Sequence, residues 1–319
     1  MKKRDFLLAL LCSVPLAAAA ANSFPERPVH IVVAYPAGST MDTLARMIAA
    51  EMQTAINAVF IVDNKPGAAG QIGAEFVTKS APDGYTLFIS GSSTHSANPS
   101  LYKQLRYDPV KDFTPIVEIA TVTYALVVNA SLPVNNMAEL ARYAKSRPKG
   151  VSYAFGSQLA QISSATITRM AGFPAVAVPY KGQPPAMSDL LGGQVDFMVA
   201  DVPFLLPQIQ GGRMRALAVL NNARSPLLPA IPTLKEQGLV GYDLAGWIGL
   251  SGPAGMPADV VKALSQASAK VLGEPAFRAR LSAMGMEYEP NSPAEFGQLV
   301  ADQVGVWSRK VKDAGIQPE

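Results

Sequence analysis

The chain has 319 residues, of which 49% are hydrophobic and 16% are charged, with 27 lysines and arginines against 24 aspartates and glutamates. This length and composition are typical of a globular protein with two α/β domains. The chain has no basic run interleaved with aromatic residues, so we expect no nucleic-acid partner. After the N-terminal segment no stretch is apolar for long enough to span a membrane.

The first 21 residues have the pattern of a secretory signal peptide. Basic residues at Lys2–Arg4 precede the apolar run Phe6–Leu16, and small residues end the segment at Ala21. The apolar run is too short for a membrane anchor, so we expect cleavage after Ala21 and export to the periplasm. Leu11 stands before Cys12, where a lipid-attachment site would need a small residue, so export without a lipid is favoured.

Removal of this leader changes the charge and the cysteine content. The leader contains three basic residues and one acidic residue, so the mature chain has 24 basic and 23 acidic residues and a net charge of +1. Cys12 is the single cysteine, so disulfides, thiolate catalysis and cysteine metal sites are excluded in the mature chain. His30 and His95 are too few and too far apart for a histidine-rich metal site. We therefore predict no metal and no cofactor.

The first predicted elements are a strand and a helix joined by small residues. An apolar, β-branched strand at Val29–Tyr35 leads through a short loop to a helix at Met41–Ile56. Such a loop leaves backbone N–H groups free at the positive end of the helix dipole, and these groups suit an anion. A simple strand–helix connection is the alternative. The candidate ligand residues of this segment are Ala37, Gly38, Ser39, Thr40 and Asp42.

Strands and helices continue to alternate through the middle of the chain. This alternation predicts mostly parallel sheets with helices on both faces and ligand crevices at the carboxyl ends of the strands. From Pro257 onward the pattern is helical, apart from a short strand at Met286–Glu289. Further strands are predicted at Val59–Asp63, Thr86–Ser90, Ala125–Asn129, Val151–Ala154, Ala175–Pro179, Val195–Ala200 and Ala216–Leu220, with helices at Gln71–Lys79, Met137–Lys145, Pro185–Leu191 and Phe204–Gly211.

Two long apolar segments, Ile116–Asn129 and Tyr242–Leu250, are candidates for paired crossings between domains. We therefore expect a discontinuous first domain, residues 22–122 and 244–319, with a second domain, residues 123–243, inserted between its two parts.

Polar loops follow several of the predicted strands. Ser92, Ser93 and Thr94 lie in a hydroxyl-rich loop whose groups suit a carboxylate, although an ordinary polar connection is equally compatible with them. A comparable loop in the second domain contains Ser157 and Gln158.

Two further strand ends carry charged or polar candidates. Tyr180 and Lys181 follow the strand Ala175–Pro179, and Lys181 is a suitable charge for an acid ligand, although lysines at such positions are usually solvated. Asp201 ends another strand, where it would suit an amine or a water on the ligand, or would only cap the helix that begins near Phe204.

Catalytic residues are scarce. The segment Gly91–His95 resembles a nucleophile elbow but lacks the closing glycine, and Gly67–Glu75 has neither dinucleotide-binding spacing nor a phosphate-loop lysine, which favours helix packing. A binding cleft is therefore the preferred interpretation. The alternative from another class is an exported α/β hydrolase that uses Ser92 or Ser93 with His95.

The whole mature chain resembles the solute-binding receptors of tripartite tricarboxylate transporters, often called Bug-type receptors. The motifs that carry the resemblance are PAGSTMDTLAR at Pro36–Arg46, GAAGQIGAE at Gly67–Glu75, DGYTL at Asp83–Leu87, NPSLY at Asn98–Tyr102, PYKG at Pro179–Gly182, DLLGGQVDFM at Asp189–Met198, PTLKEQG at Pro232–Gly238 and GPAGMP at Gly252–Pro257.

The resemblance implies a two-domain periplasmic-binding-protein fold, similar to type II, with a hinged cleft that closes on a small organic or amino acid. It implies a monomer that is not an enzyme and that docks on a permease of one large and one small membrane subunit. A receptor that feeds a sensor protein is the related alternative. Backbone amides and waters at Ala37–Thr40 would hold the carboxylate, helped by Ser92–Thr94 and Ser157–Leu159, which adds Leu159 to the candidates.

Two positions depart from the family pattern. Ser39 stands where the first loop usually has a second glycine, and Gln161-Ile162 stands where a His-Leu pair is common. The Ser39 side chain adds a donor and narrows the floor of the loop, which would change the shape of the ligand, and Gln161-Ile162 leaves the contacts at the far end of the ligand open.

Overall fold

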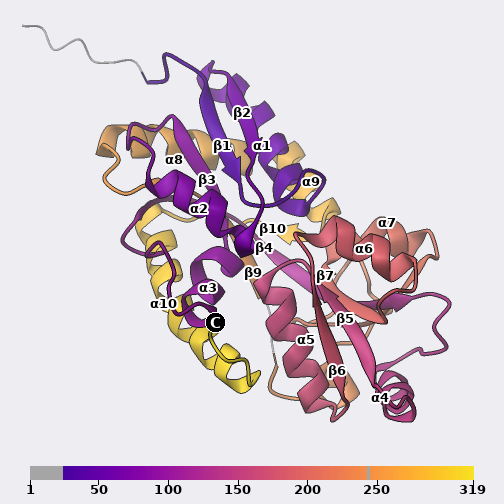
Figure 1. The fold of residues 1–319 in the computed structure, drawn as a ribbon. Helices are drawn as coiled ribbons and strands as arrows, with labels where there is room; N and C mark the ends of the chain where they lie inside the picture. The colour runs from indigo at the N-terminus through magenta and orange to yellow at the C-terminus, as the bar shows by residue number, and fades with distance from the viewer. Residues whose placement is uncertain (1–23, 243–244) are drawn as a thin grey trace, which may run out of the picture.

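The computed structural model describes residues 24–242 and 245–319, so the predicted signal peptide, residues 1–21 with Cys12, lies outside the described residues. Strands and helices alternate along the chain, which confirms the predicted α/β class (Figure 1). The strands are β1 (Val29–Val33), β2 (Phe60–Asn64), β3 (Thr86–Gly91), β4 (Phe113–Asn129), β5 (Val151–Phe155), β6 (Ala175–Pro179), β7 (Phe197–Asp201), β8 (Met214–Val219), β9 (Ala245–Pro253) and β10 (Met286–Glu287).

The strands are ordered β2-β1-β3-β9-β4-β7-β5-β6, and β8 and β10 also pair with β4. We call the part around β1 the first sheet and the part around β5 the second sheet. In the first sheet β1 pairs in parallel with β2 and β3, and in the second sheet β5 pairs in parallel with β6 and β7. The pairings of β4 and β9 between these outer parts are antiparallel.

The 17-residue strand β4 belongs to both sheets. Its residues up to Thr123 pair with β9 in the first sheet, and from Tyr124 onward it pairs with β7 and β8 in the second. The predicted crossing at Ile116–Asn129 falls on this strand. The division into residues 22–122 with 244–319 and residues 123–243 stays a prediction, and the change of partners within β4 supports it.

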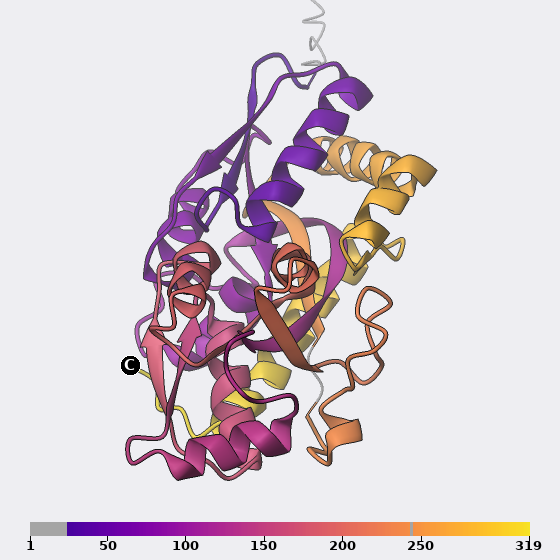
Figure 2. The ribbon, with the colours of Figure 1, turned by 90° about the vertical axis from the view of Figure 1, so that its right-hand side faces the viewer.

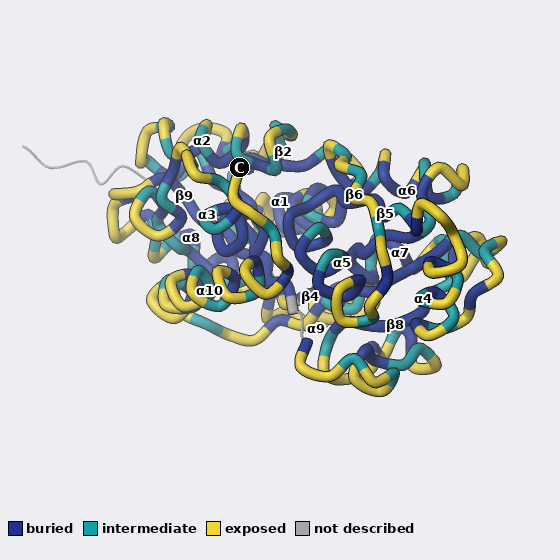
Figure 3. The backbone as a smooth tube through the Cα atoms, turned by 60° about the horizontal axis from the view of Figure 1, so that its bottom comes forward, coloured by how far each residue is buried: buried dark blue, intermediate teal, exposed yellow. Residues whose placement is uncertain are grey.

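Amphipathic helices cover the sheets. α1 buries Leu44, Ile48 and Met52 at helical spacing and packs against α8 (Figure 2). Buried residues follow the strands and the inner faces of the helices, whereas exposed residues lie on the outside (Figure 3). The α-helices are α1 (Thr40–Ile56), α2 (Gln71–Thr78), α3 (Asn98–Leu101), α4 (Met137–Ser146), α5 (Gln158–Met170), α6 (Gln183–Leu191), α7 (Val202–Gln210), α8 (Ala258–Gly273), α9 (Pro275–Ala283) and α10 (Pro293–Asp313).

Two segments differ from the sequence expectation. The hydroxyl-rich segment expected as a loop forms a π-helical turn at Ser92–Ala97, and all of its residues are buried. Helix α5 was not predicted, because its run of serine, threonine and β-branched residues has modest helix propensity. In both cases tertiary packing stabilises the helical conformation, because the π-helical turn lies against α10 and α5 buries nine residues.

No helix within residues 24–242 and 245–319 is both long and apolar enough to cross a membrane.

Candidate functional site

The carboxyl ends of strands from both sheets meet at two adjoining cavities. Helices α1, α5, α6 and α7 are the next elements after β1, β5, β6 and β7, so their N-termini are grouped at this edge. The deep cavity has a volume of about 30 Å³ and the outer cavity about 480 Å³. Tyr35 and Gly156 line both cavities, which makes them two ends of one cleft.

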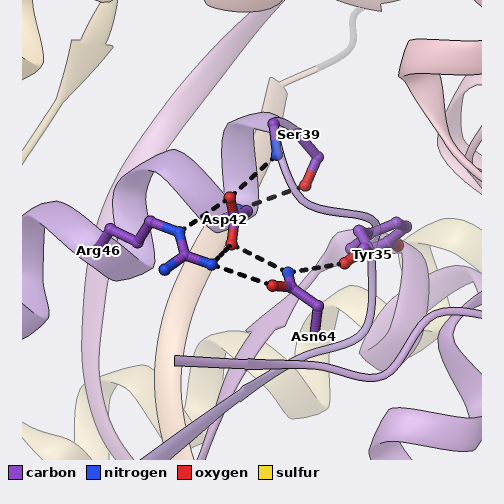
Figure 4. Close-up of polar contacts among 6 residues, drawn as sticks. Tyr35, Ser39, Asp42, Arg46 and Asn64 are labelled. Atoms are coloured by element: carbon purple, nitrogen blue, oxygen red, sulfur yellow. Dashed lines mark hydrogen bonds and ion pairs between the residues drawn. The ribbon is translucent and has the colours of Figure 1, made fainter. Parts of the chain in front are cut away.

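The turn between β1 and α1 is fixed by its own residues. The Ser39 hydroxyl caps α1 by accepting from the Asp42 backbone N–H at 3.3 Å, and the Gly38 N–H donates to Asp42 Oδ2 at 3.0 Å (Figure 4). Gly38 has φ +79°, a left-handed conformation that favours glycine. The side chain of Asp42 therefore shapes the loop from behind and does not reach the cleft.

The same carboxylate ties this turn to the neighbouring strand. Asn64, at the end of β2, donates from Nδ2 to Asp42 Oδ1 at 2.9 Å and to the Tyr35 carbonyl at 3.0 Å (Figure 4). Arg46 pairs with Asp42 at 2.9 Å. Burial by itself would raise the pKa of Asp42, but the hydrogen bonds from Arg46, Gly38 and Asn64 outweigh it and hold the pKa below its usual value. Asp42 is therefore ionised in the folded protein at neutral pH.

The deep cavity joins residues of the two sheets. Thr40, at the start of α1, donates its hydroxyl proton to Asp201 Oδ1 at the end of β7. The Leu159 N–H of α5 approaches the Ser93 hydroxyl at 3.4 Å. The wall of the deep cavity consists of Tyr35, Ser39, Thr40, Met41, Ser93, Val122, Tyr124, Gly156, Ser157, Gln183, Asp201 and Ile248.

Asp201 is the charged group of the deep cavity and is 3% exposed. It caps α7 by accepting from the Phe204 N–H at 3.1 Å, and it also accepts from Gln183 Nε2 at 2.5 Å. Burial raises the pKa of Asp201 above its usual value, although the hydrogen bonds from Thr40, Gln183 and Phe204 oppose this effect. Asp201 is therefore a helix cap that also lines the cavity, and its contact with an amine or a water of the ligand stays a prediction.

The outer cavity is lined by amide, phenol and ammonium groups and by one acidic residue, Glu319. Gln158 Nε2 donates to the Tyr102 hydroxyl at 3.1 Å and to Gln161 Oε1 at 3.2 Å. The Tyr180 hydroxyl donates to Asp189 Oδ2 at 2.6 Å, and this hydrogen bond raises the pKa of Tyr180 to about 12. Lys181 is exposed and forms no ion pair with any residue in the described part of the chain, so its charge is available to an anion in this cavity.

The structure divides the predicted site residues into three sets. Ala37 and Gly38 are exposed on the turn, Asp42 lies behind it, and Ser92, Thr94 and Leu159 are buried next to the cavities without lining them. Ser92, for example, accepts from the Trp247 backbone N–H at 2.8 Å. The deep cavity contains Ser39, Thr40, Ser93, Ser157 and Asp201, and the outer cavity contains Gln158, Tyr180 and Lys181.

Several wall residues were not predicted from the sequence. Gly67–Gly70, assigned there to helix packing, lines the outer cavity. Tyr35 was included only as the last residue of a strand, and Gln183 directly follows the motif Pro179–Gly182 without having been noted. Each of these residues lies in the segment that follows a strand, and this position was the signal that could have identified them.

His95 does not form a catalytic pair. It is 1% exposed and lies among aromatic rings, with the Phe113 ring centroid at 4.4 Å, and its Nδ1 contacts Thr94 Oγ1 at 3.0 Å. Burial lowers the pKa of His95 to about 3. Among the described residues, no hydrogen bond joins His95 to Ser92 or Ser93, and no group of three or more potential metal ligands comes together.

A match to a protein-family model shows which family the chain belongs to. The model described as the tripartite tricarboxylate transporter family receptor matches residues 44–316. The chain belongs to this family. It is thus a solute-binding receptor and not an enzyme, which confirms the family predicted from the motifs and makes the hydrolase alternative wrong.

Solved receptors have the same fold. Rpa4515 of R. palustris, solved with adipate, is 36% identical with a TM-score of 0.90 and covers 93% of this chain and 100% of its own. The periplasmic binding protein BugD is 34% identical with a TM-score of 0.89 and the same coverage. MatC from Rhodopseudomonas palustris, with bound malate, is 31% identical with a TM-score of 0.86 and covers 90% of this chain and 100% of its own. The receptor therefore has the periplasmic-binding-protein fold.

Proposed function

We propose that this receptor captures a small carboxylate in the cleft between the two sheets and closes around it. The observation that carries the proposal is the convergence of the N-termini of α1, α5 and α6 on one cleft beside Lys181. The first amides of α1 and α5 have no partner within their helices, and α6 contributes the Gln183 N–H, because Pro184 and Pro185 have none. The helix dipoles add positive potential at the same place. An anion is the ligand that this arrangement favours.

The size of the outer cavity also supports a small organic acid. Its volume of about 480 Å³ lies in the range of small-molecule pockets. Rpa4515 was solved with adipate and MatC with malate, and both are dicarboxylates of four to six carbons. We therefore expect a dicarboxylate of similar length, or an amino acid, to bind here.

Closure would bring residues 22–122 and 244–319 toward residues 123–243. The change of strand partners between Thr123 and Tyr124 supports this division. The contacts of Thr40 with Asp201 and of Leu159 with Ser93 join the two units across the cleft. These contacts would form on closing and separate on opening.

The remaining parts of the proposal follow from the family. The receptor would be exported by a cleaved signal peptide at residues 1–21, act as a monomer in the periplasm and deliver its ligand to a permease of one large and one small subunit. Delivery to a sensor protein is the alternative. Co-purification of the ligand-loaded receptor with each of these membrane domains distinguishes the two.

A thermal-shift screen tests ligand capture. We expect at least one member of a panel of mono-, di- and tricarboxylates and amino acids to raise the melting temperature. A ligand at 100 times its dissociation constant stabilises the folded state by about 2.7 kcal/mol. The neutral diamides of the same acids serve as controls and should give no shift. A panel in which no acid raises the melting temperature contradicts the proposal.

A further inference from the structure

One side of the deep cavity, formed by Thr40, Gln183 and Asp201, presents hydrogen-bond acceptors, whereas the rest of its polar wall consists of the hydroxyl groups of Tyr35, Ser39, Ser93, Tyr124 and Ser157. Thr40 uses its hydroxyl proton on Asp201, so its oxygen faces the cavity only as an acceptor. Gln183 is 9% exposed, and its Oε1 has no partner in the described part of the chain. The Asp201 carboxylate is the third acceptor. A ligand carboxylate beside these three acceptors would be repelled, whereas a hydrogen-bond donor would satisfy them.

The contacts of Asp201 indicate an ionised carboxylate that can still accept a hydrogen bond. Oδ1 accepts from Thr40 and from the Phe204 N–H, and Oδ2 accepts from Gln183 Nε2. All three partners donate, which fits the ionised form, and Oδ2 can accept one more hydrogen bond. No described Lys, Arg or His forms an ion pair with Asp201, so the hydrogen bonds from Thr40, Gln183 and the Phe204 N–H are its compensation, with those of Thr40 and Gln183 the larger. A buried charge without an ion-pair partner is costly, and a cation beside it would lower that cost.

The size of the deep cavity limits what that donor can be. A volume of about 30 Å³ holds one group of the size of a water molecule. An ammonium group has this size and carries the opposite charge to Asp201. A carboxylate is larger and carries the same charge.

Resting on the proposed function, we infer that the deep cavity is a subsite for the protonated amino group of the ligand, which Asp201 Oδ2 and Gln183 Oε1 accept. The ligand carboxylate then lies toward the outer cavity, at the N-terminus of α5 and near Lys181. The receptor therefore selects an amino acid over the carboxylic acid that has the same skeleton without the amine.

The capping of α7 can be separated from this role. Asparagine is as good an N-cap as aspartate, so Asp201→Asn keeps the acceptor for the Phe204 N–H and removes the charge. We expect its melting temperature without ligand to stay within about 2 °C of the wild type. Gln183→Met is the second variant, because it keeps the side-chain length and removes the unpartnered Oε1. Asp302→Asn, on the exposed face of α10, is the control for the loss of one charge.

Calorimetric titrations with all twenty amino acids and with the matching amine-free acids test the inference, including aspartate against succinate and glutamate against glutarate. We expect the best amino acid to bind at least tenfold more tightly than its amine-free partner. Asp201→Asn should lower the affinity for the amino acid at least tenfold and change that for the amine-free acid by less than threefold. Gln183→Met should also reduce the preference for the amino acid over its amine-free partner. Asp302→Asn should leave this preference unchanged.

Amine-free acids that bind as tightly as their amino partners overturn the inference and leave the proposed function intact. Equal losses for both members of a pair in Asp201→Asn also overturn it, because Asp201 then acts only through the shape of the cleft. If no acid of either kind binds, both the inference and the proposed function fail.

Discussion

His95 is a buried base that the fold keeps neutral. Its ring stacks on Phe88 with centroids 5.8 Å apart and lies edge-on to Trp247 at 6.0 Å, so protonation would place a charge among aromatic rings. The folded pKa of about 3 lies below the ordinary value of 6.5. Between these two pH values the unfolded chain binds one more proton than the folded chain. The free energy of unfolding therefore falls as the pH drops through this window.

His95→Phe should remove this part of the pH dependence, because phenylalanine keeps the ring contacts and cannot be protonated. Each pH unit below 6.5 costs the wild type about 1.4 kcal/mol. Between pH 7.5 and pH 5.0 the difference in free energy of unfolding between variant and wild type should therefore change by about 2 kcal/mol in favour of the variant. Urea unfolding at both pH values measures this change. Parallel pH profiles for the two proteins would contradict the assignment.

At the scale of elements, the turn between β1 and α1 depends on one carboxylate. Asp42 accepts from Gly38, Arg46 and Asn64 and is 4% exposed, so it joins the turn, the helix and β2. Asp42→Ala should lower the free energy of unfolding by about 2 kcal/mol, because buried donors lose their acceptor. It should also weaken ligand binding, because the turn loses its shape. Chemical unfolding and titration with the ligand from the thermal-shift screen measure the two effects.

Ser39→Gly is the matched control for the turn. Glycine replaces serine at an N-cap at a cost of a few tenths of a kcal/mol, so this variant should fold as stably as the wild type. Unchanged affinity in a folded Asp42→Ala variant would show that the turn does not shape the site.

The sequence predicts elements well where one periodicity dominates. The helix α1 begins one residue before its predicted start, since its apolar spacing and its Ser39 cap agree. The pattern does not predict α5 or the π-helical turn Ser92–Ala97, since their polar sequences are helical only through tertiary burial.

The same limit applies to the site. The strand ends identify Ser39, Thr40 and Asp201 as neighbours of a cleft, because parallel strands end at one edge of a sheet. That Gln183 and Asp201 share the deep cavity cannot be predicted, because it depends on how two loops pack in three dimensions.

At the scale of the whole molecule, Gly182, which follows β6 of the second sheet, lies against Pro36, which follows β1 of the first sheet. A Cβ on Gly182 would lie 2.7 Å from Cδ of Pro36, which belongs to the opposite side of the cleft. Its φ of 161° is extended backbone that any residue adopts, so the only obstacle to a side chain here is this contact. The closed arrangement therefore requires glycine at this position.

Gly182→Ala should impair closure and leave folding unchanged. We expect the affinity for the ligand to fall at least tenfold, because the bound state needs the close approach to Pro36, while the melting temperature without ligand stays near that of the wild type. Gly192→Ala, at the other end of α6, is the control, because its Cβ would lie 3.4 Å from the nearest atom, an ordinary contact. Equal affinities for Gly182→Ala and the control would contradict the role of this contact.

The position of β9 has a consequence for how the chain assembles. β9 lies between β3 and β4, although the whole segment from β5 to β8 precedes it in the sequence. A growing chain therefore contains every strand of the second sheet before it contains the strand that completes the first. Until β9 is made, β3 presents an unpaired edge to other chains, which is a site for aggregation. Pairing of β9 with β3 closes a long loop, which costs more chain entropy than pairing of strands that are neighbours in the sequence.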